Sequence, residues 1–151
     1  MAEEFYTETQ ETEKEEGQQC LTFLSDKLTF AVSTEHVIEI ITNYTVTPVP
    51  LVPHFIKGII NVRGQILPIL DMRLRLGLAE QKSETSCTII LEIGSIMVGL
   101  VVDAICQVID IHQDQLTPVP VDNHQELASS LISLPDSRVI LLLNLNALLQ
   151  A

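Results

Sequence analysis

The sequence has no tryptophan, few aromatic residues and no long run of apolar residues. A membrane-spanning helix needs about 20 consecutive apolar residues, so we expect no direct insertion into a membrane. The first residues are acidic and lack an apolar segment, which excludes a secretory signal peptide. These absences together predict a cytoplasmic protein.

Residues that bind metals or form disulfides are also scarce. The three cysteines (Cys20, Cys87 and Cys106) are odd in number and show no CxxC spacing. This spacing is typical of thiols in a reducing compartment and not of a disulfide framework or a zinc site. The four histidines are scattered and form no HExxH pattern. We therefore expect no metal site and no cofactor.

Basic residues are few, and the formal net charge is −12. Binding to nucleic acid needs a basic surface, so we expect no nucleic-acid partner. Residues 20–82 hold six basic and five acidic residues, whereas residues 83–151 hold one basic and eight acidic residues. The first half could therefore present cations to an acidic partner. Its main basic cluster is Lys57, Arg63, Arg73 and Arg75.

Aliphatic residues dominate what is present, because 46% of the chain is apolar and Ile, Leu and Val are the main types. Short apolar segments punctuated by Gly and Pro predict many short strands. Ser33 or Thr34 and Asp71 can each cap a short helical turn, and a helix is expected at the C-terminal end. The expected strands lie near residues 21–24, 28–32, 37–41, 58–70 (two strands), 87–93, 95–102, 103–111 and 138–144.

The tetrapeptide TPVP occurs twice, at residues 47–50 and 117–120. Around it, residues 29–41 align with 97–109, and residues 65–74 align with 138–147. The alignment places Val37 opposite Ile105 and Asp71 opposite Asn144. An offset that grows in small steps is typical of loop-length drift in a duplicated unit. We therefore predict an internal duplication.

The duplication predicts an all-β protein of two small packed barrels, with short helical turns and a C-terminal helix. Residues 1–18 are expected to be a disordered acidic tail. The first barrel is expected over residues 19–80 and the second over residues 81–151. Exchange of terminal strands between the barrels stays open.

Enzymatic motifs are lacking, since the sequence has no GxSxG, P-loop, GxGxxG or kinase signature. Asp71 and Asp103 are the only candidates for paired catalytic carboxylates. We expect each to begin a helical turn and to accept hydrogen bonds from free N–H groups there. The sequence therefore predicts a protein that is not an enzyme.

The stretch FIKGIINVRGQILPILDMRLRLGL, the element VGLVVDAICQVI and the two TPVP copies resemble the CheW family of chemotaxis coupling proteins. Their order matches the family over nearly all of residues 19–149. The resemblance implies two packed SH3-like five-stranded barrels. It also implies a non-enzymatic adaptor that couples the cytoplasmic tip of a chemoreceptor to the regulatory domain of the histidine kinase CheA, a domain that is itself CheW-like.

The resemblance also implies roles for single residues. Val37, Glu39 and Arg63 match family positions associated with receptor binding, and Lys57 and Gly58 match an element implicated in partner contacts, with receptor or kinase. The duplication adds Ile105, the counterpart of Val37, as a receptor-binding candidate facing a groove between the barrels.

This sequence departs from the family pattern at three places. They are Asn144, where Asp is more common, His54, and the glycine-free segment LASSLIS. An alternative function, a small-ligand or nucleic-acid-binding barrel of OB type, is weakened by the few aromatic residues, because base stacking needs them.

Overall fold

The computed structural model describes residues 17–118 and 127–150. The expected disordered tail lies outside the described residues, except that Gly17 and Gln18 already belong to the first strand. The end of the second TPVP copy also lies outside them. The described elements are β1 (Gly17–Ser25), β2 (Leu28–Ser33), η1 (Thr34–His36), β3 (Val37–Ile41), β4 (Ile56–Val62), β5 (Gln65–Asp71), α2 (Met72–Arg75), β6 (Cys87–Ile93), β7 (Ile96–Val102), β8 (Ala104–His112), η2 (Gln113–Gln115), β9 (Leu116–Pro118), β10 (Ala128–Ser133), β11 (Val139–Leu143) and α3 (Leu145–Leu148).

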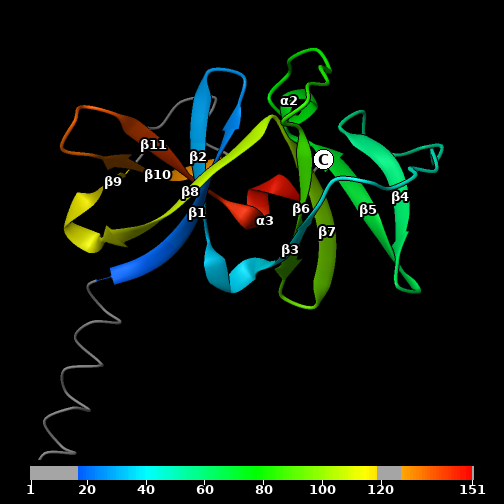
Figure 1. The fold of residues 1–151 in the computed structure, drawn as a ribbon, viewed down its shortest axis with the longest axis horizontal. Helices are drawn as coiled ribbons and strands as arrows, with labels where there is room; N and C mark the ends of the chain where they lie inside the picture. The colour runs from blue at the N-terminus through cyan, green and yellow to red at the C-terminus, as the bar shows by residue number, and fades with distance from the viewer. Residues whose placement is uncertain (1–16, 119–126, 151) are drawn as a thin grey trace, which may run out of the picture.

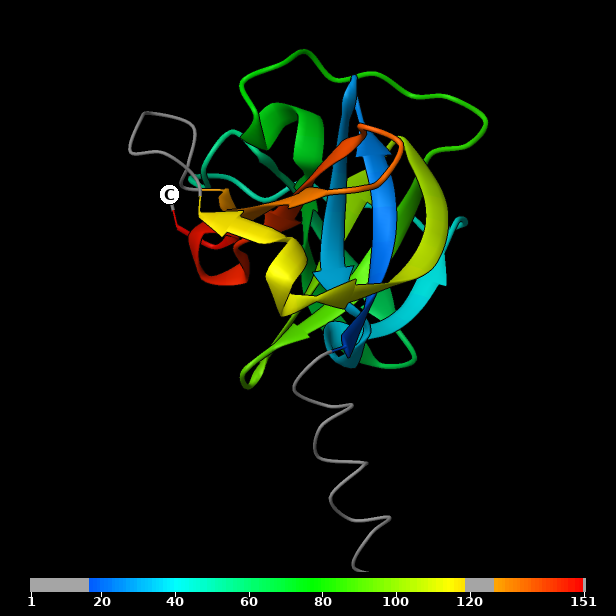
Figure 2. The ribbon, with the colours of Figure 1, turned by 90° about the vertical axis from the view of Figure 1, so that its left-hand side faces the viewer.

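The strands form two sheets, which confirms the all-β expectation (Figure 1). One sheet has the order β8-β1-β2-β11-β10-β9 and the other the order β3-β6-β7-β5-β4. Five strands were expected in each unit, and the first sheet has a sixth because the short β9 pairs with β10. Figure 2 views the molecule from the side of this sheet, where β8 curves strongly beside β1.

The boundary expected at residue 80 does not separate the two sheets. The hairpin of β1 and β2 pairs with β8 and β11 from the second half of the chain. The hairpin of β6 and β7 pairs with β3 and β5 from the first half. Each unit thus completes its sheet with a hairpin from the other half, which is the strand exchange that the sequence left open. The sequence could not predict this exchange, because the two equivalent hairpins have the same pattern of apolar residues.

The pairing registers of the two sheets repeat each other, as the duplication predicts. Val37 lies opposite Leu91, and its counterpart Ile105 lies opposite Phe23, the counterpart of Leu91. The parallel pairs also correspond, since Ile69 lies opposite Gly99 and Leu142 lies opposite Ala31. The duplication therefore extends to the register of single residues.

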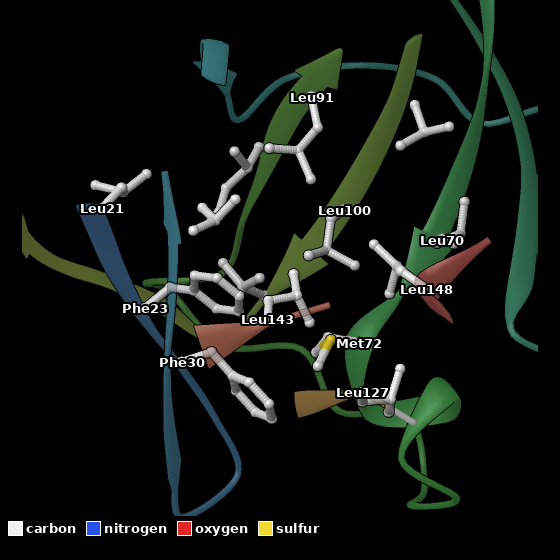
Figure 3. Packing of buried hydrophobic residues seen from close by; sticks show 14 of the residues in the cluster. Leu21, Phe23, Phe30, Leu70, Met72, Leu91, Leu100, Leu127, Leu143 and Leu148 are labelled. Atoms are coloured by element: carbon white, nitrogen blue, oxygen red, sulfur yellow. The ribbon is translucent and has the colours of Figure 1, made fainter. Parts of the chain in front are cut away.

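Buried apolar side chains form three clusters, one for each sheet and one shared. Cys20, Ile111 and Ile132 belong to the cluster of the six-stranded sheet, and Ile60 and Ile90 to that of the five-stranded sheet. Larger side chains fill the space between the sheets (Figure 3). They include Phe23, Phe30, Leu70, Met72, Leu91, Leu100, Leu143 and Leu148. Each sheet thus surrounds its own core, and the shared core joins them.

The two α-helical turns begin at equivalent residues. Asp71 Oδ1 accepts a hydrogen bond from Leu74 N at 3.1 Å, and Asn144 Oδ1 accepts one from Ala147 N at 3.2 Å. The cap therefore survives the change from Asp to Asn, as expected. Arg75 of α2 donates to the carbonyl oxygens of Ala147 and Gln150 and so holds α3 against α2. Neither helix is long and apolar enough to cross a membrane, and the same holds for any helix in the described residues.

Candidate protein-interaction site

Arg63 and Glu39 form an ion pair across the mouth of the five-stranded barrel. Arg63 Nη2 donates to Glu39 Oε1. Glu39 belongs to β3 and Arg63 follows β4, and these are the two outer strands of the sheet. The Arg63 side chain is 72% exposed, whereas that of Glu39 is 29% exposed. A guanidinium has five N–H donors, so Arg63 can contact a partner carboxylate while it stays paired.

The turn that carries Arg63 is tight and fixed. Arg63 and Gly64 have φ angles of +52° and +85°, and Val62 pairs directly with Gln65. Positive φ at both central residues is typical of the type I′ hairpin turn. Asn61 Oδ1 accepts a hydrogen bond from Gly64 N at 2.8 Å, which satisfies a turn N–H. The guanidinium is thus presented from a rigid position and not from a long loop.

A β-bulge in β3 sets the direction of Glu39. The register of β3 against β6 shifts between Val37 and Glu39, so that Ile38 has no direct partner. Bulges re-aim side chains next to functional sites. Ile38 and Ile40, which flank Glu39 in β3, are 45% and 43% exposed. The strand therefore carries exposed apolar surface as well as the carboxylate of the ion pair.

Val37 and Ile105 occupy equivalent places on β3 and β8. Both are half-buried and pack against the shared core. The space between the sheets, where we expected an open groove, is filled by this core. Val37 and Ile105 therefore lie at its margin, and Val37 is two residues from Glu39 on the same strand.

Lys57 and Gly58 have internal roles in β4. Lys57 Nζ lies 3.4 Å from Glu80 Oε1 and 4.0 Å from Asp71 Oδ2. Gly58 is buried with φ of +151°, and a Cβ there would lie 2.2 Å from the carbonyl oxygen of Thr47. Because Thr47 exchanges two backbone hydrogen bonds with Ile59, the glycine allows the crossing chain to approach the strand.

The other barrel does not repeat the charged pair. Gln107 is the counterpart of Glu39 and lies at an equivalent bulge, where its N–H donates to the side chain of Thr22. The turn equivalent to that of Arg63 carries Asp136 and Arg138, which pair with each other. Among these equivalent described residues, an ion pair that links two edge strands therefore occurs in the five-stranded barrel and not in the six-stranded one.

Each barrel has a cavity at an equivalent end. The cavity of the six-stranded barrel, about 720 Å³, is lined by Gln18, Gln19, Ser33 and Gln113 among others. The cavity of the five-stranded barrel, about 460 Å³, is lined by the counterparts of these residues, Ser86, Cys87, Val101 and Thr45. The two cavities are therefore related by the duplication but differ in their polar side chains. The first has amide side chains, and the second contains Lys57 with its partners Asp71 and Glu80.

The side chains considered for catalysis have structural partners. Burial raises the pKa of Asp71, whose carboxylate caps α2. The expectation that Asp103 begins a helical turn is wrong, because it lies between β7 and β8. Its Oδ2 instead accepts hydrogen bonds from Arg73 Nη1 and Asp26 N. Burial raises the pKa of the Cys20 thiol to about 11, so that thiol is unreactive. Within residues 17–118 and 127–150, no group of three or more His, Cys, Asp or Glu side chains could hold a metal ion.

The fold and the exposed surface of the five-stranded sheet together define a class of protein. Two β-sheets share one core, and the five-stranded sheet carries an exposed arginine and two exposed isoleucines, which is typical of a surface that binds other proteins. A family model described as "CheW-like domain" matches residues 19–151. The chain therefore belongs to the CheW-like family.

Three relatives illustrate the similarity. The chemotaxis protein CheW of Thermotoga maritima is 27% identical over 86% of this chain and 86% of its own length. The CheW protein of Rhizobium meliloti is 30% identical over 87% of this chain and 86% of its own length. The crystal structure of the scaffolding protein TtCheW from Thermoanaerobacter tengcongensis has a TM-score of 0.82 at 29% identity, covering 89% of this chain and 93% of that one.

Proposed function

We propose that this chain is a non-enzymatic adaptor of the bacterial cytoplasm, which couples the tip of a chemoreceptor to the histidine kinase CheA. The observation that carries the proposal is the Glu39–Arg63 pair on an exposed, rigid turn of a CheW-like fold. A chemoreceptor tip is a helical hairpin, and acidic side chains on such a helix are suitable partners for the exposed guanidinium.

The receptor surface in this proposal is centred on the ion pair. Ile38 and Ile40 provide exposed apolar area on β3, and Val37 borders them at the margin of the shared core. Ile105 lies at the equivalent margin on β8 and contributes from the other barrel. An apolar stripe of the receptor helix contacts these residues, while Arg63 binds a carboxylate at the rim.

In this proposal, the surface that binds the kinase lies at the open ends of the two barrels, where the two cavities are. The regulatory domain of CheA is itself CheW-like, so it presents the same kinds of barrel ends as this chain. The cavity of the six-stranded barrel has an apolar floor and an amide-rich rim, which suits a protein partner. The opening near Lys57 is the equivalent surface on the other barrel. Lys57 and Gly58 then act by supporting this opening.

An OB-type nucleic-acid function has little support. The described phenylalanines, Phe23, Phe30 and Phe55, are buried, and Tyr44 is half-buried and hydrogen-bonded to Thr88. These aromatic rings are therefore not displayed for base stacking.

Separate binding measurements test the proposal. Isothermal titration of the chain with a CheA regulatory domain and with a receptor-tip fragment should detect both complexes. The variant Arg63→Glu should lose the receptor complex and keep the kinase complex. Failure of the parent chain to bind either partner would overturn the proposal.

A further inference from the structure

The chain crosses from one sheet to the other twice within its described part. The first crossing is η1, which joins β2 to β3, and the second is Asp103, which joins β7 to β8. They lie at opposite ends of the molecule, with η1 at the bottom of Figure 1 and the start of β8 near the top. Val37 directly follows the first crossing, and Ile105 follows the second by two residues. Each crossing therefore positions one of these two residues.

Hydrogen bonds from both sheets fix the second crossing. Asp103 N donates to the carbonyl oxygen of Leu24 at 2.9 Å, and Asp103 Oδ2 accepts from Asp26 N at 2.7 Å. These two bonds tie the crossing to the β1–β2 hairpin of the six-stranded sheet. The carbonyl oxygen of Asp103 also accepts from Thr85 Oγ1 at 2.8 Å, on the connection from α2 to β6 of the five-stranded sheet. The crossing is thus bonded on both sides.

Arg73 of α2 joins the crossing to the β1–β2 turn through one guanidinium. Arg73 Nη1 lies 3.0 Å from Asp103 Oδ2 and 3.3 Å from Asp26 Oδ1. Arg73 Nε donates to the carbonyl oxygen of Ala79 at 2.9 Å, which orients the guanidinium plane. The side chain is only 12% exposed, so it has little surface with which to contact a partner. Its planar fork fixes several bonds at once, which the ammonium of a lysine on a flexible stem does not do.

The first crossing does not carry the equivalent network. The counterparts of Asp26, Arg73 and Asp103 are Gly94, Asn146 and Glu35. Gly94 has no side chain and Asn146 has no charge. The side chain of Glu35 is 71% exposed and lies 3.5 Å from the neighbouring His36. Among these equivalent residues, the link between the two sheets is therefore made at Asp103 and not at Glu35.

We propose that Arg73 is a positioning residue for receptor binding, which fixes the crossing at Asp103 and thereby the place of Ile105 relative to Val37. Directly after the crossing, β8 pairs with β1, where Phe23 lies opposite Ile105. A β1–β2 hairpin that loses its link to the crossing therefore moves β8 as well. The inference rests on the receptor surface proposed above and adds a residue that the receptor does not touch. The cavity of the six-stranded barrel is lined by residues outside this network, so kinase binding through it does not require Arg73.

Binding measurements on the full chain test the proposal. Arg73→Lys keeps the charge but cannot span the same acceptors. It should weaken binding of a receptor-tip fragment about tenfold and leave binding of the CheA regulatory domain unchanged in titration calorimetry. Asp26→Asn removes one carboxylate, tolerates the φ of +58° at this turn and should weaken receptor binding in the same direction. Arg75→Lys is the matched control on the same helix. Because the hydrogen bonds of Arg75 go to α3, receptor binding should not change.

Two spin labels report the crossing without a receptor. One is attached to Cys106, which is exposed beside Ile105, whereas the other two cysteines are buried. The second is attached to Glu92→Cys, an exposed position on β6, the strand that pairs with β3. Pulsed electron paramagnetic resonance should give one narrow distance distribution for the labelled parent chain. In Arg73→Lys the distribution should broaden or shift.

Several results would overturn the proposal. One is an Arg73→Lys variant that folds and binds the receptor fragment as tightly as the parent. Others are equal losses of receptor and kinase binding, equal losses in Arg73→Lys and Arg75→Lys, or an unchanged distance distribution. If Arg73→Lys does not fold, the same comparisons apply to Asp26→Asn. A parent chain that binds no receptor would contradict the proposed function instead, and the distance measurement would still decide whether Arg73 fixes the crossing.

Discussion

Arg63, in the turn after β4, and Glu39, in β3, form an ion pair that links the two outer strands of one sheet. The pair links the two edges of the five-stranded sheet, and the Arg63 side chain stays 72% exposed. Its counterparts in the other barrel, Gln107 and the Asp136 turn, make no such bridge. The two equivalent sheet edges therefore carry different side chains. This difference is our reason for assigning the receptor to the surface around Arg63 and not to the equivalent surface around Gln107.

Replacing Arg63 with Glu should weaken binding of a receptor-tip fragment by roughly tenfold or more, because a partner carboxylate would then face a like charge. The fold should remain intact, with a change in unfolding free energy of about 1 kcal/mol or less, since the pair is largely solvated. Titration calorimetry and urea denaturation measure the two effects. Lys82→Glu is the control for net charge, and equal binding by Arg63→Glu and Lys82→Glu would contradict the role of Arg63.

Gly58→Ala should destabilise the fold by about 2–4 kcal/mol, because the new Cβ would overlap the carbonyl oxygen of Thr47. Gly64→Ala is the matched comparison. Its φ is also positive, but an added Cβ meets nothing within 4 Å, so only the backbone strain of about 1 kcal/mol is expected. Similar denaturation midpoints for the two variants would show that close approach at Gly58 is unimportant.

Asp71 should make stability depend on pH in an unusual direction. Burial raises its pKa above the ordinary value of 3.8, so the folded protein binds a proton more tightly than the unfolded chain does. The contribution of Asp71 to the free energy of unfolding should therefore be largest below pH 3.8, the ordinary pKa of the unfolded chain. This contribution should be lost as the pH rises through the higher pKa of the folded protein. Asp71→Asn keeps a capping oxygen and removes the titration. Denaturation at several pH values should show the parent gaining stability relative to Asp71→Asn in acid, and a constant difference would refute the prediction.

Arg73 should matter more for stability than a surface arginine does. It joins Asp103 to Asp26 of the β1–β2 turn, and Asp103 holds the pKa of Arg73 above its usual range. Arg73→Met should lower the midpoint of thermal unfolding. Arg138→Met removes an arginine whose partner, Asp136, is two residues away on an exposed turn. Calorimetry that finds equal midpoints for both variants would argue against the Arg73 link.

Local chemistry explains what could be predicted from the sequence. A pattern of a few residues predicts the cap at Asp71. The repeat along the chain predicts the equivalence of Asp71 with Asn144 and of Val37 with Ile105. The strand exchange could not be predicted, because either hairpin satisfies the same apolar pattern in either sheet. The pairing of Arg63 with Glu39 depends on barrel closure across 24 residues, which no local pattern encodes. Exposure of Ile38 depends on a bulge.

Reconstituted signalling tests the central claim most directly. A CheA kinase, a receptor fragment and this chain should be combined, and kinase autophosphorylation measured with each component omitted in turn. We predict that receptor control of phosphorylation requires this chain, and that Arg63→Glu abolishes that control while the variant still binds the kinase. Receptor control that is unchanged when the chain is omitted, or that is fully retained by Arg63→Glu, would contradict the account.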